Sequence, residues 1–469
     1  MPVPVLTVAQ MREWEELSWR AGKSVDTVMG LAGAALARQA LAMTRPHDAI
    51  LLLAGKGNNG GDTKRAIEHL VERQVRLLEI TEPEMAHDDL AVQLAAKPAL
   101  VVDGLFGIGL NRPLQKGWVE MVRQLNESAL PVLAVDVPSG LCADTGAPLG
   151  VAVRARATLT FGAPKAGCLS PAAAQQVGRL LLADDIGLIA CPHTADSYWT
   201  VPGDFAGTPP PRAADAHKGS FGHVGIMAGS LGYHGAAVLA ARGALAARPG
   251  LVTVLTPENV YVPVASQLQS AMAHPWSAAA AQHLQHCTAF VMGPGLASPD
   301  IPENFKSAAA ELWQHSPKPV VADASALDWL PLTNVSTPHG AVRVITPHPG
   351  EAARLLNMTA QAVQLDRQQT LRKLSAMLPS AWIVLKGQHT LIATADTPVW
   401  INSSGNPMLA QGGSGDVLAG LLGGYLAQPW AQRDPVTAIR FAVWRHGHAA
   451  DCLSASRESW GMDELIGQL

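Results

Sequence analysis

The sequence predicts an α/β protein built from two domains, and three observations support this. The chain has 469 residues, which is more than a single hydrophobic core usually supports. Apolar residues make up 48% of it and charged residues only 15%, as in globular domains with large buried cores. Short apolar runs alternate with longer helical stretches in both halves. We therefore expect an N-terminal Rossmann-like three-layer α/β/α domain followed by a second α/β domain.

Four apolar runs in the first half are expected to form strands. They lie at residues 49–54, 75–80, 99–103 and 132–136. Because the runs are uniformly apolar rather than alternating, we expect strands that are buried on both faces, as in a parallel sheet covered by helices. The stretches between them are long enough to form the crossover connections that parallel strands need.

The second half repeats this pattern after a break. Six further strands are expected at residues 223–228, 251–255, 289–292, 319–323, 342–346 and 382–386, with helices at about 415–426 and 435–451. Periodicity is lost between residues 188 and 216, where three consecutive prolines at 209–211 interrupt any regular element. We therefore expect domains at residues 1–205 and 217–469, joined by a linker at 206–216.

Charge and cysteine content limit the partners and the compartment. A formal net charge of −4 gives no general attraction to nucleic acid or to an anionic membrane, so we expect small-molecule substrates. The five cysteines are scattered and contain no C-x-x-C pair, which favours a reducing compartment. The start of the chain carries charges where a signal peptide is apolar, and no apolar run reaches membrane-spanning length. We expect a soluble, cytoplasmic protein, and the sequence leaves open whether it forms a homo-oligomer.

A glycine-rich loop follows the first expected strand. Residues 55–62 read GKGNNGGD and precede a helix that we expect to begin near Thr63. At the carboxyl end of a parallel strand, glycines let the backbone approach a phosphate, and the amides of the helix start attract it. Glycines alone would fit a structural turn, but Asn58, Asn59 and Asp62 add donors and oxygen ligands. The loop is therefore predicted to bind a phosphate-containing ligand.

Two more loops at strand ends begin with a carboxylate. They read DGLFGIGL from Asp103 and DVPSG from Asp136. An aspartate at a strand end is often only a helix cap. However, the carboxyl ends of parallel strands meet at one edge of a sheet, so the three loops are expected to converge on one crevice.

The motifs GNNGGD, VDGLFGIGL and AVDVPSGL resemble the three signature loops of the NAD(P)H-hydrate epimerase family, over roughly residues 4–190. The resemblance implies a potassium ion held by Asn59, Asp103 and Ser139, and a catalytic role for Asp136. Inverting a carbinolamine carbon requires a carboxylate that exchanges a proton with the departing and returning hydroxyl. Residues implied to bind the hydrated dinucleotide are Asn58, Asn59, Gly60, Gly61, Asp62, Gly107, Ile108, Gly109, Leu110, Asn111, Arg112, Pro113 and Asp136.

The second half contains a glycine run that leads into a helix. Residues 410–420 read AQGGSGDVLAG, which places Asp416 in the first helical turn. Amides at a helix start can stabilise a phosphoryl group in transfer, and an aspartate beside them can take the proton of the attacking hydroxyl. Asp416 could also be a simple helix-terminal charge. Other motifs in this half decide between the two.

These motifs are HKGSFGHVGIMAGS (217–230), GYHGAAVLAARGAL (232–245), GPGL (293–296), HPGEAARLL (348–356) and KGQHT (386–390). The ordered set resembles the ADP-dependent (S)-NAD(P)H-hydrate dehydratase branch of the ribokinase-like superfamily. The resemblance implies phosphorylation of the hydrate by ADP, with Mg²⁺, followed by loss of phosphate. Implied contacts to the hydrated cofactor are Ala236, Gly295, His348 and the catalytic Asp416. Implied contacts to the donor nucleotide are Lys386, Gly387, Gln388, His389, Thr390 and Gly415.

Two alternatives remain open from the sequence. A ribokinase-like vitamin-precursor kinase would also contain the G-x-G-D element. The N-terminal half could instead be a non-catalytic nucleotide-binding module, because Thr63, the pair Met29 and Gly30, and the short segment 81–98 depart from the epimerase pattern.

Overall fold

The computed structural model describes residues 2–333 and 337–469, and it divides the chain into two compact units. The first unit is Val3–Trp199, and the second runs from Thr200 to Leu469. Residue 1 of the expected N-terminal domain lies outside the described residues. The limits expected from the sequence, 1–205 and 217–469 with a linker between them, remain our proposal.

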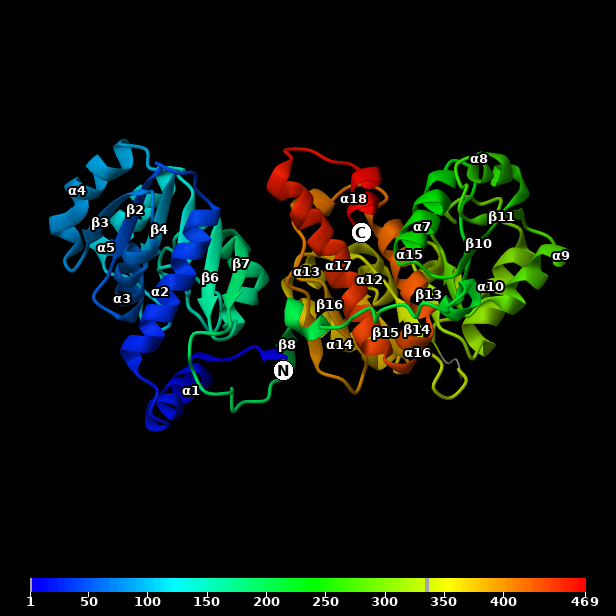
Figure 1. The fold of residues 1–469 in the computed structure, drawn as a ribbon, viewed down its shortest axis with the longest axis horizontal. Coiled ribbons are helices and arrows are strands. Elements are labelled where there is room, and N and C mark those ends of the chain that lie inside the picture. The colour runs from blue at the N-terminus through cyan, green and yellow to red at the C-terminus, as the bar shows by residue number, and fades with distance from the viewer. Residues whose placement is uncertain (1, 334–336) are drawn as a thin grey trace. The chain divides into compact units, whose positions relative to one another are not determined.

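The first unit alternates strands and helices along the chain (Figure 1). Its elements are β1 (Val3–Pro4), α1 (Val8–Arg20), α2 (Val25–Ala42), β2 (Ala49–Ala54), α3 (Asn58–Ala66), β3 (Gln74–Glu79), α4 (Pro83–Ala95), β4 (Leu100–Gly104), α5 (Lys116–Glu127), β5 (Val132–Val135), β6 (Ala157–Phe161), α6 (Ala174–Val177), β7 (Arg179–Ala183) and β8 (Ser197–Trp199).

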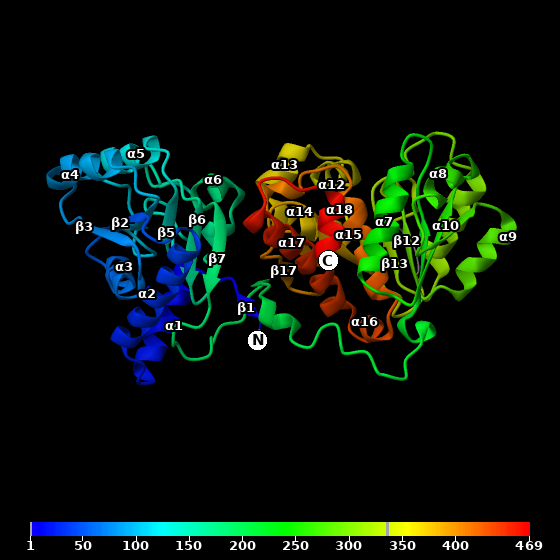
Figure 2. The ribbon, with the colours of Figure 1, turned by 45° about the horizontal axis from the view of Figure 1, so that its top comes forward.

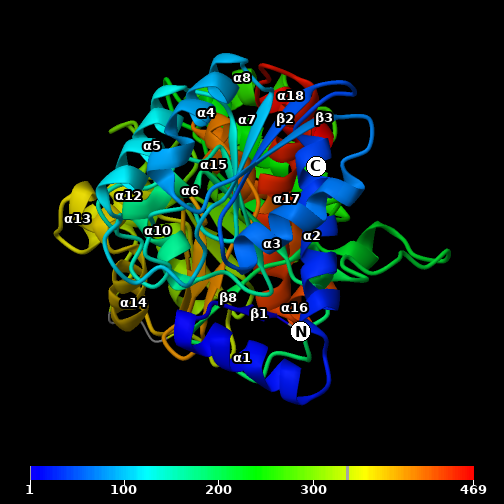
Figure 3. The same ribbon diagram turned by 90° about the vertical axis from the view of Figure 1, so that its left-hand side faces the viewer.

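Six parallel strands of this unit form one sheet, in the order β3-β2-β4-β5-β6-β7. Alternate residues of β2 enter different cores: Ile50 and Leu52 pack with α2, whereas Leu51 and Leu53 pack with α4 and α5. Figure 3 shows α2 on one side of the strands and α4 and α5 on the other. The expected Rossmann-like three-layer arrangement is therefore confirmed.

One strand differs from its expected burial. β3 was expected to be covered on both faces, but four of its six residues are exposed and none is fully buried. It is the edge strand of the sheet, with β2 as its only neighbour. Its polar residues, among them Arg76 and Glu79, fit this position.

The second unit contains a longer series of elements. They are β9 (His223–Met227), α7 (His234–Ala246), β10 (Leu251–Thr256), α8 (Tyr261–Ala265), β11 (Met272–Pro275), α9 (Ala278–Ala281), β12 (Ala289–Met292), α10 (Glu303–His315), β13 (Val320–Ala322), α11 (Ala326–Trp329), β14 (Arg343–Ile345), α12 (Pro349–Leu355), α13 (Ala360–Leu365), α14 (Arg367–Met377), β15 (Ala381–Leu385), β16 (Leu391–Ala393), β17 (Val399–Ile401), α15 (Ser414–Leu426), α16 (Pro429–Arg433), α17 (Pro435–Ser456) and α18 (Met462–Gln468).

The strands of the second unit follow the order β17-β16-β15-β14-β13-β12-β9-β10-β11. β9 to β15 are parallel, and β16 and β17 add an antiparallel edge. Helices α7, α15 and α17 bury one face of the sheet (Figure 2). A Cβ on Gly420 of α15 would lie only 1.9 Å from the Ala240 carbonyl oxygen, so the close contact of α15 with α7 requires glycine.

In each sheet the direction of the crossovers reverses once. The reversal falls between β2 and β4 in the first unit and between β9 and β12 in the second. Ligands of open α/β sheets bind at such points, outside the carboxyl ends of the strands. The loops singled out in the sequence follow the carboxyl ends of strands in these two sheets or lead into α15. No helix among the described residues is long and apolar enough to cross a membrane.

Candidate active sites

The glycine loop after β2 is tightly packed and leads directly into α3. A Cβ on Gly60 would lie 2.0 Å from the Gly55 carbonyl oxygen, so only glycine fits there. α3 begins at Asn58, not near Thr63 as expected, because the asparagines form its first turn. Gly57 caps this helix without a side-chain hydrogen bond, so the first amides are available to a ligand.

The three predicted potassium ligands meet around a buried carboxylate. Asp103, fully buried at the end of β4, accepts hydrogen bonds from the Ser139 amide (2.9 Å) and hydroxyl (2.6 Å). Burial raises the pKa of Asp103, and no cationic side chain within 2–333 or 337–469 forms an ion pair with it. The Asn59 amide donates to the carbonyls of Phe106 (3.0 Å) and Val135 (2.6 Å). A buried carboxylate without a cationic partner, beside the Ser139 hydroxyl that also reaches the Phe106 carbonyl, offers oxygen ligands for a monovalent ion.

Asp136 follows β5 and forms a buried ion pair with Lys165. Its Oδ1 lies 2.5 Å from Nζ of Lys165, and the two residues are only 5% and 1% exposed. The Thr160 hydroxyl and the Phe161 amide donate to the same oxygen, each at 3.1 Å. Asp136 has a φ of +64°, in the left-handed region that favours glycine. Such strain at a loop between strands is typical of a functional position.

Asp136, Phe161 and Lys165 line a cavity of about 650 Å³. Burial, followed by the nearby Asp136 and Glu15 carboxylates, raises the pKa of Asp62 to about 8. Met29, of the pair Met29 and Gly30 that departs from the epimerase pattern, also lines this cavity. The predicted site residues in its wall are Asn58, Asn59, Asp62, Gly107, Ile108, Gly109, Leu110, Asn111, Arg112 and Asp136. Gly60, Gly61, Asp103, Pro113 and Ser139 are not part of the wall.

The sequence interpretation missed Lys165 and Glu15. The signal for Lys165 was the run ATLTF at 157–161 followed by GAPK, a further strand ending at the same sheet edge. Glu15 lies on helix α1, so a search for polar residues at the ends of expected strands did not identify it. Thr63, in contrast, is accommodated: it is fully buried and its hydroxyl donates to the Asn59 carbonyl at 2.7 Å.

The Asp136–Lys165 pair yields a prediction about stability. Lys165→Met should lower the free energy of unfolding of the first unit by about 3 to 5 kcal/mol, because it leaves a buried carboxylate unpaired. The matched control is Lys64→Met, which removes the exposed ion pair with Glu79 and should cost about 0 to 1 kcal/mol. Hydrogen–deuterium exchange of the β4 and β5 amides measures both. Equal losses in the two variants would contradict a buried, paired Asp136.

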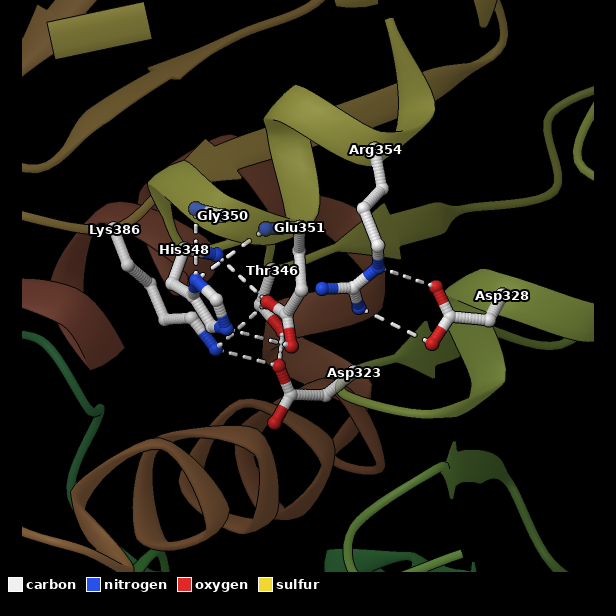
Figure 4. A network of polar contacts seen from close by, with 8 residues as sticks. All are labelled: Asp323, Asp328, Thr346, His348, Gly350, Glu351, Arg354 and Lys386. Atoms are coloured by element: carbon white, nitrogen blue, oxygen red, sulfur yellow. Dashed lines mark hydrogen bonds and ion pairs between the residues drawn. The ribbon is translucent and has the colours of Figure 1, made fainter. Parts of the chain in front are cut away.

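In the second unit, charged side chains gather at the ends of β13, β14 and β15 (Figure 4). Asp323 Oδ1 accepts from the Thr346 hydroxyl at 2.5 Å and from Lys386 Nζ at 2.7 Å. Glu351 Oε2 lies 3.8 Å from the same ammonium. Burial alone would lower the pKa of Lys386, but the surrounding carboxylates, Asp323 first among them, outweigh it and raise the pKa. One ammonium therefore balances two nearly buried carboxylates.

His348 begins α12 and is tied to Glu351. Its Nδ1 accepts from the amides of Gly350 (3.0 Å) and Glu351 (3.3 Å), and its own amide donates to Glu351 Oε2 at 2.7 Å. The reciprocal capping fixes the loop after β14. His348 Nε2 lies 3.3 Å from Glu351 Oε1, and half of the side chain is exposed. His348 is thus held rigidly while remaining open to a ligand.

Asp416 lies in the first turn of α15. The preceding Gly413 is in the left-handed conformation and provides no side-chain cap. The Ser414 amide donates to the Gln411 carbonyl at 3.4 Å, whereas the amides of Gly415 and Asp416 have no acceptor among the described residues and are open to a ligand. Burial, followed by the Asp323 carboxylate, raises the pKa of Asp416 to about 7. A Cβ on Gly415 would lie 3.3 Å from Lys386 Nζ and 3.9 Å from Asp323 Oδ2. The glycine-rich helix start and the charged cluster therefore form one site.

The remaining predicted residues lie in the first turn of α7 and on the loops after β12 and β15. Ala236, in the first turn of α7, packs against Gly295, and the Ser230 hydroxyl ties the loop before α7 to the loop after β12 by donating to the Gly295 carbonyl at 2.6 Å. In the predicted nucleotide segment, Gly387 and Gln388 are exposed, whereas His389 and Thr390 are partly buried. Arg367 fixes this segment by donating to the carbonyls of Leu385 and Lys386. Asp323 and Glu351 were not assigned from the sequence, although Asp323 ends the expected strand 319–323 and Glu351 lies in the loop motif after the expected strand 342–346.

Both halves of the chain match known protein families. A family model described as NAD(P)H-hydrate dehydratase matches residues 224–466, and one described as YjeF-related protein N-terminus matches residues 63–167. A bifunctional NAD(P)H-hydrate repair enzyme of Gloeobacter violaceus is 36% identical over 97% of this chain and 94% of its own length. The chain belongs to the family of bifunctional NAD(P)H-hydrate repair enzymes. The resemblance inferred from the loop motifs is confirmed.

Two solved structures resemble the second unit. A ribokinase-like superfamily protein of Enterococcus faecalis covers 60% of this chain and 96% of its own, with 23% identity and a TM-score of 0.50, which shows the ribokinase-like fold. An ADP/ATP-dependent NAD(P)H-hydrate dehydratase of Bacillus subtilis, co-crystallized with ATP and Mg²⁺, is 31% identical over 55% of this chain and 91% of its own, with a TM-score of 0.49. Membership of the repair family over nearly the full length argues against the vitamin-precursor kinase.

Proposed function

We propose that this chain repairs hydrated NADH and NADPH in two steps. The first unit interconverts the R and S hydrates, and the second dehydrates the S hydrate with ADP, releasing AMP and phosphate. Support comes from family membership over nearly the whole chain and from the two carboxylate sites at the sheet edges. The substrates are small molecules, and the free cysteines suit the reducing cytoplasm.

The dehydratase assignment rests chiefly on Asp416 at the start of α15. With its pKa near 7, the carboxylate can accept the proton of the attacking hydroxyl at neutral pH. The free amides of α15 and the ammonium of Lys386 stabilise the phosphoryl group in transfer. The phosphorylated hydroxyl is then a good leaving group, and the ring nitrogen supplies the electrons that expel it.

A divalent cation fits the same cluster. Asp323 and Glu351 direct carboxylate oxygens at one cationic point, now taken by Lys386 Nζ, and Asp323 Oδ2 faces the start of α15. One or two carboxylates together with substrate phosphates are the usual ligands of Mg²⁺. We propose that these two residues hold Mg²⁺, which would neutralise charge on the donor phosphates. Lys386, Gly387, Gln388, His389, Thr390 and Gly415 would hold the nucleotide.

The epimerase assignment rests on Asp136 in the cavity of the first unit. We propose that Asp136 takes a proton when a hydroxyl is added to the hydrated ring, and that Lys165 balances its charge. The helix start at Asn58 and the loop from Gly107 to Arg112 would hold the dinucleotide. Asn59, Asp103 and Ser139 would hold K⁺, which offsets the buried charge of Asp103. The hydrogen bond of Thr63 to the Asn59 carbonyl keeps the loop intact at this departure, which supports our choice of a catalytic first unit over a non-catalytic module.

Replacing Asp416 tests the dehydratase. Asp416→Asn should lower turnover of the S hydrate with ADP by about 10² or more, because an amide cannot accept the hydroxyl proton. Wild-type turnover should rise with pH through about 7, since the carboxylate is protonated and inactive below that value. AMP affinity, measured by calorimetry, should be unchanged in the variant. Wild-type turnover in the Asp416→Asn variant would rule out Asp416 as the base.

Potassium dependence tests the epimerase site. Conversion of R to S hydrate should require K⁺, and Asp103→Asn should remove this requirement together with most of the activity, because the buried charge that holds the ion is lost. The assay compares buffers that contain only K⁺ or only Na⁺ at equal ionic strength, with dehydration of the S hydrate as the internal control. Equal conversion in both buffers would contradict the ion site.

A further inference from the structure

Helix α1 packs against the loop that carries Lys165. Its buried residues Met11, Trp14 and Ser18 follow helical spacing and define the inward face of the helix. A Cβ on Gly162, just after β6, would meet Met11 Cε and a Trp14 ring carbon, each at 3.1 Å. Leu6, just before α1, donates its amide to the Pro164 carbonyl at 2.9 Å. α1 is therefore fixed to the segment that leads to Lys165.

Glu15 lies on this inward side, four residues after Met11 and three before Ser18. It lines the same cavity as Asp136 and Lys165, and its side chain is partly buried. Within residues 2–333 and 337–469, no hydrogen bond or ion pair holds its carboxyl group. Burial raises the pKa of Glu15, with Lys165 opposing the shift and Asp136 adding to it. A partly buried carboxyl group that lines a cavity and has no partner is a candidate for a functional role.

Its neighbours on α1 differ. Glu16 is 65% exposed and pairs with Arg20 one turn later, while Glu13 points away and is 64% exposed beside His193. Asp62, the other carboxyl group of the cavity, sits on α3 within the loop proposed to hold the dinucleotide. Among the carboxyl groups of α1 and of the cavity, Glu15 therefore combines two features. It lies on the helix that packs on the Lys165 loop, and no described residue pairs with it.

We propose that Glu15 is a second catalytic residue of the epimerase. It donates a proton to the ring hydroxyl that leaves, whereas Asp136 accepts a proton from the water that replaces it. The inference rests on the proposed epimerase function. Inversion at one carbon requires a hydroxyl to leave one face of the ring and return on the other, so two proton-transfer groups from two different elements suit the reaction better than one.

The chemical step balances with water as the only co-reactant. The Glu15 carboxyl group gives its proton to the departing hydroxyl, the C–O bond breaks, and water leaves with the bonding electrons. The ring nitrogen lone pair forms the C=N bond of an iminium ion. A second water adds to the opposite face: its lone pair forms the new C–O bond, the π electrons of the C=N bond return to the nitrogen as its lone pair, and one proton of the water passes to Asp136. Proton exchange with solvent resets both carboxyl groups.

Two variants on one helix test the inference. Glu15→Gln should lower the turnover number for R to S conversion by about 10², because an amide cannot donate the proton, with KM changed less than about threefold. Glu16→Gln is the matched control and should keep wild-type turnover. Glu15→Asp, which retains the acid, should recover part of the lost activity, and this separates a chemical role from damage to the fold.

A second readout follows the oxygen atom. In H₂¹⁸O, each wild-type inversion should place one solvent oxygen in the product, after subtraction of the exchange seen without enzyme. Retention of the original oxygen would overturn the proposed step. Wild-type turnover in Glu15→Gln, or loss of turnover only in Asp62→Asn, would overturn the role of Glu15 while leaving the epimerase function intact. If the wild-type chain interconverts neither hydrate, the proposed epimerase function itself fails.

Discussion

Both sites depend on buried carboxylates that a single lysine balances. In the first unit Lys165 pairs with Asp136, and in the second Lys386 lies between Asp323 and Glu351. Each ammonium is the main positive charge among several acids, and burial, followed by the excess of neighbouring carboxylates, raises the pKa of Asp62 to about 8 and that of Asp416 to about 7. A carboxyl group that titrates near pH 7 can serve as acid or base there, so the charge imbalance that costs stability also provides the chemistry.

The two folds create this imbalance in the same way. Parallel strands deliver the side chains at their carboxyl ends to one edge of each sheet, where Asp136 and Lys165 meet in the first unit and Asp323 and Lys386 in the second. Helices α3 and α15 begin there without side-chain caps, so their free amides provide positive potential for phosphates beside the acids. Phosphate binding and proton transfer are thereby kept close together but on different groups.

Much of this arrangement could be predicted from the sequence. The buried strands β2, β4, β5, β9 and β12 are visible as uniform apolar runs, and the loops after them contain most of the predicted site residues. The alternation of threonine with apolar residues hid β6, so Lys165 at its end was missed. β3 was wrongly expected to be buried, because composition does not reveal which strand lies at an edge. Glu15 and the tie between Lys386 and Asp323 depend on packing between segments distant in sequence, which no local pattern encodes.

The central claim is that one chain performs two consecutive repair reactions at two separate charge clusters. The most direct measurement is a time course on the pure R hydrate with the full-length protein, Mg²⁺ and K⁺, in the presence and absence of ADP. We predict that S hydrate accumulates without ADP, and that with ADP the R hydrate is converted completely to NADH with an equal amount of AMP. Consumption of S hydrate alone, with R hydrate lost no faster than in the absence of protein, would contradict the account.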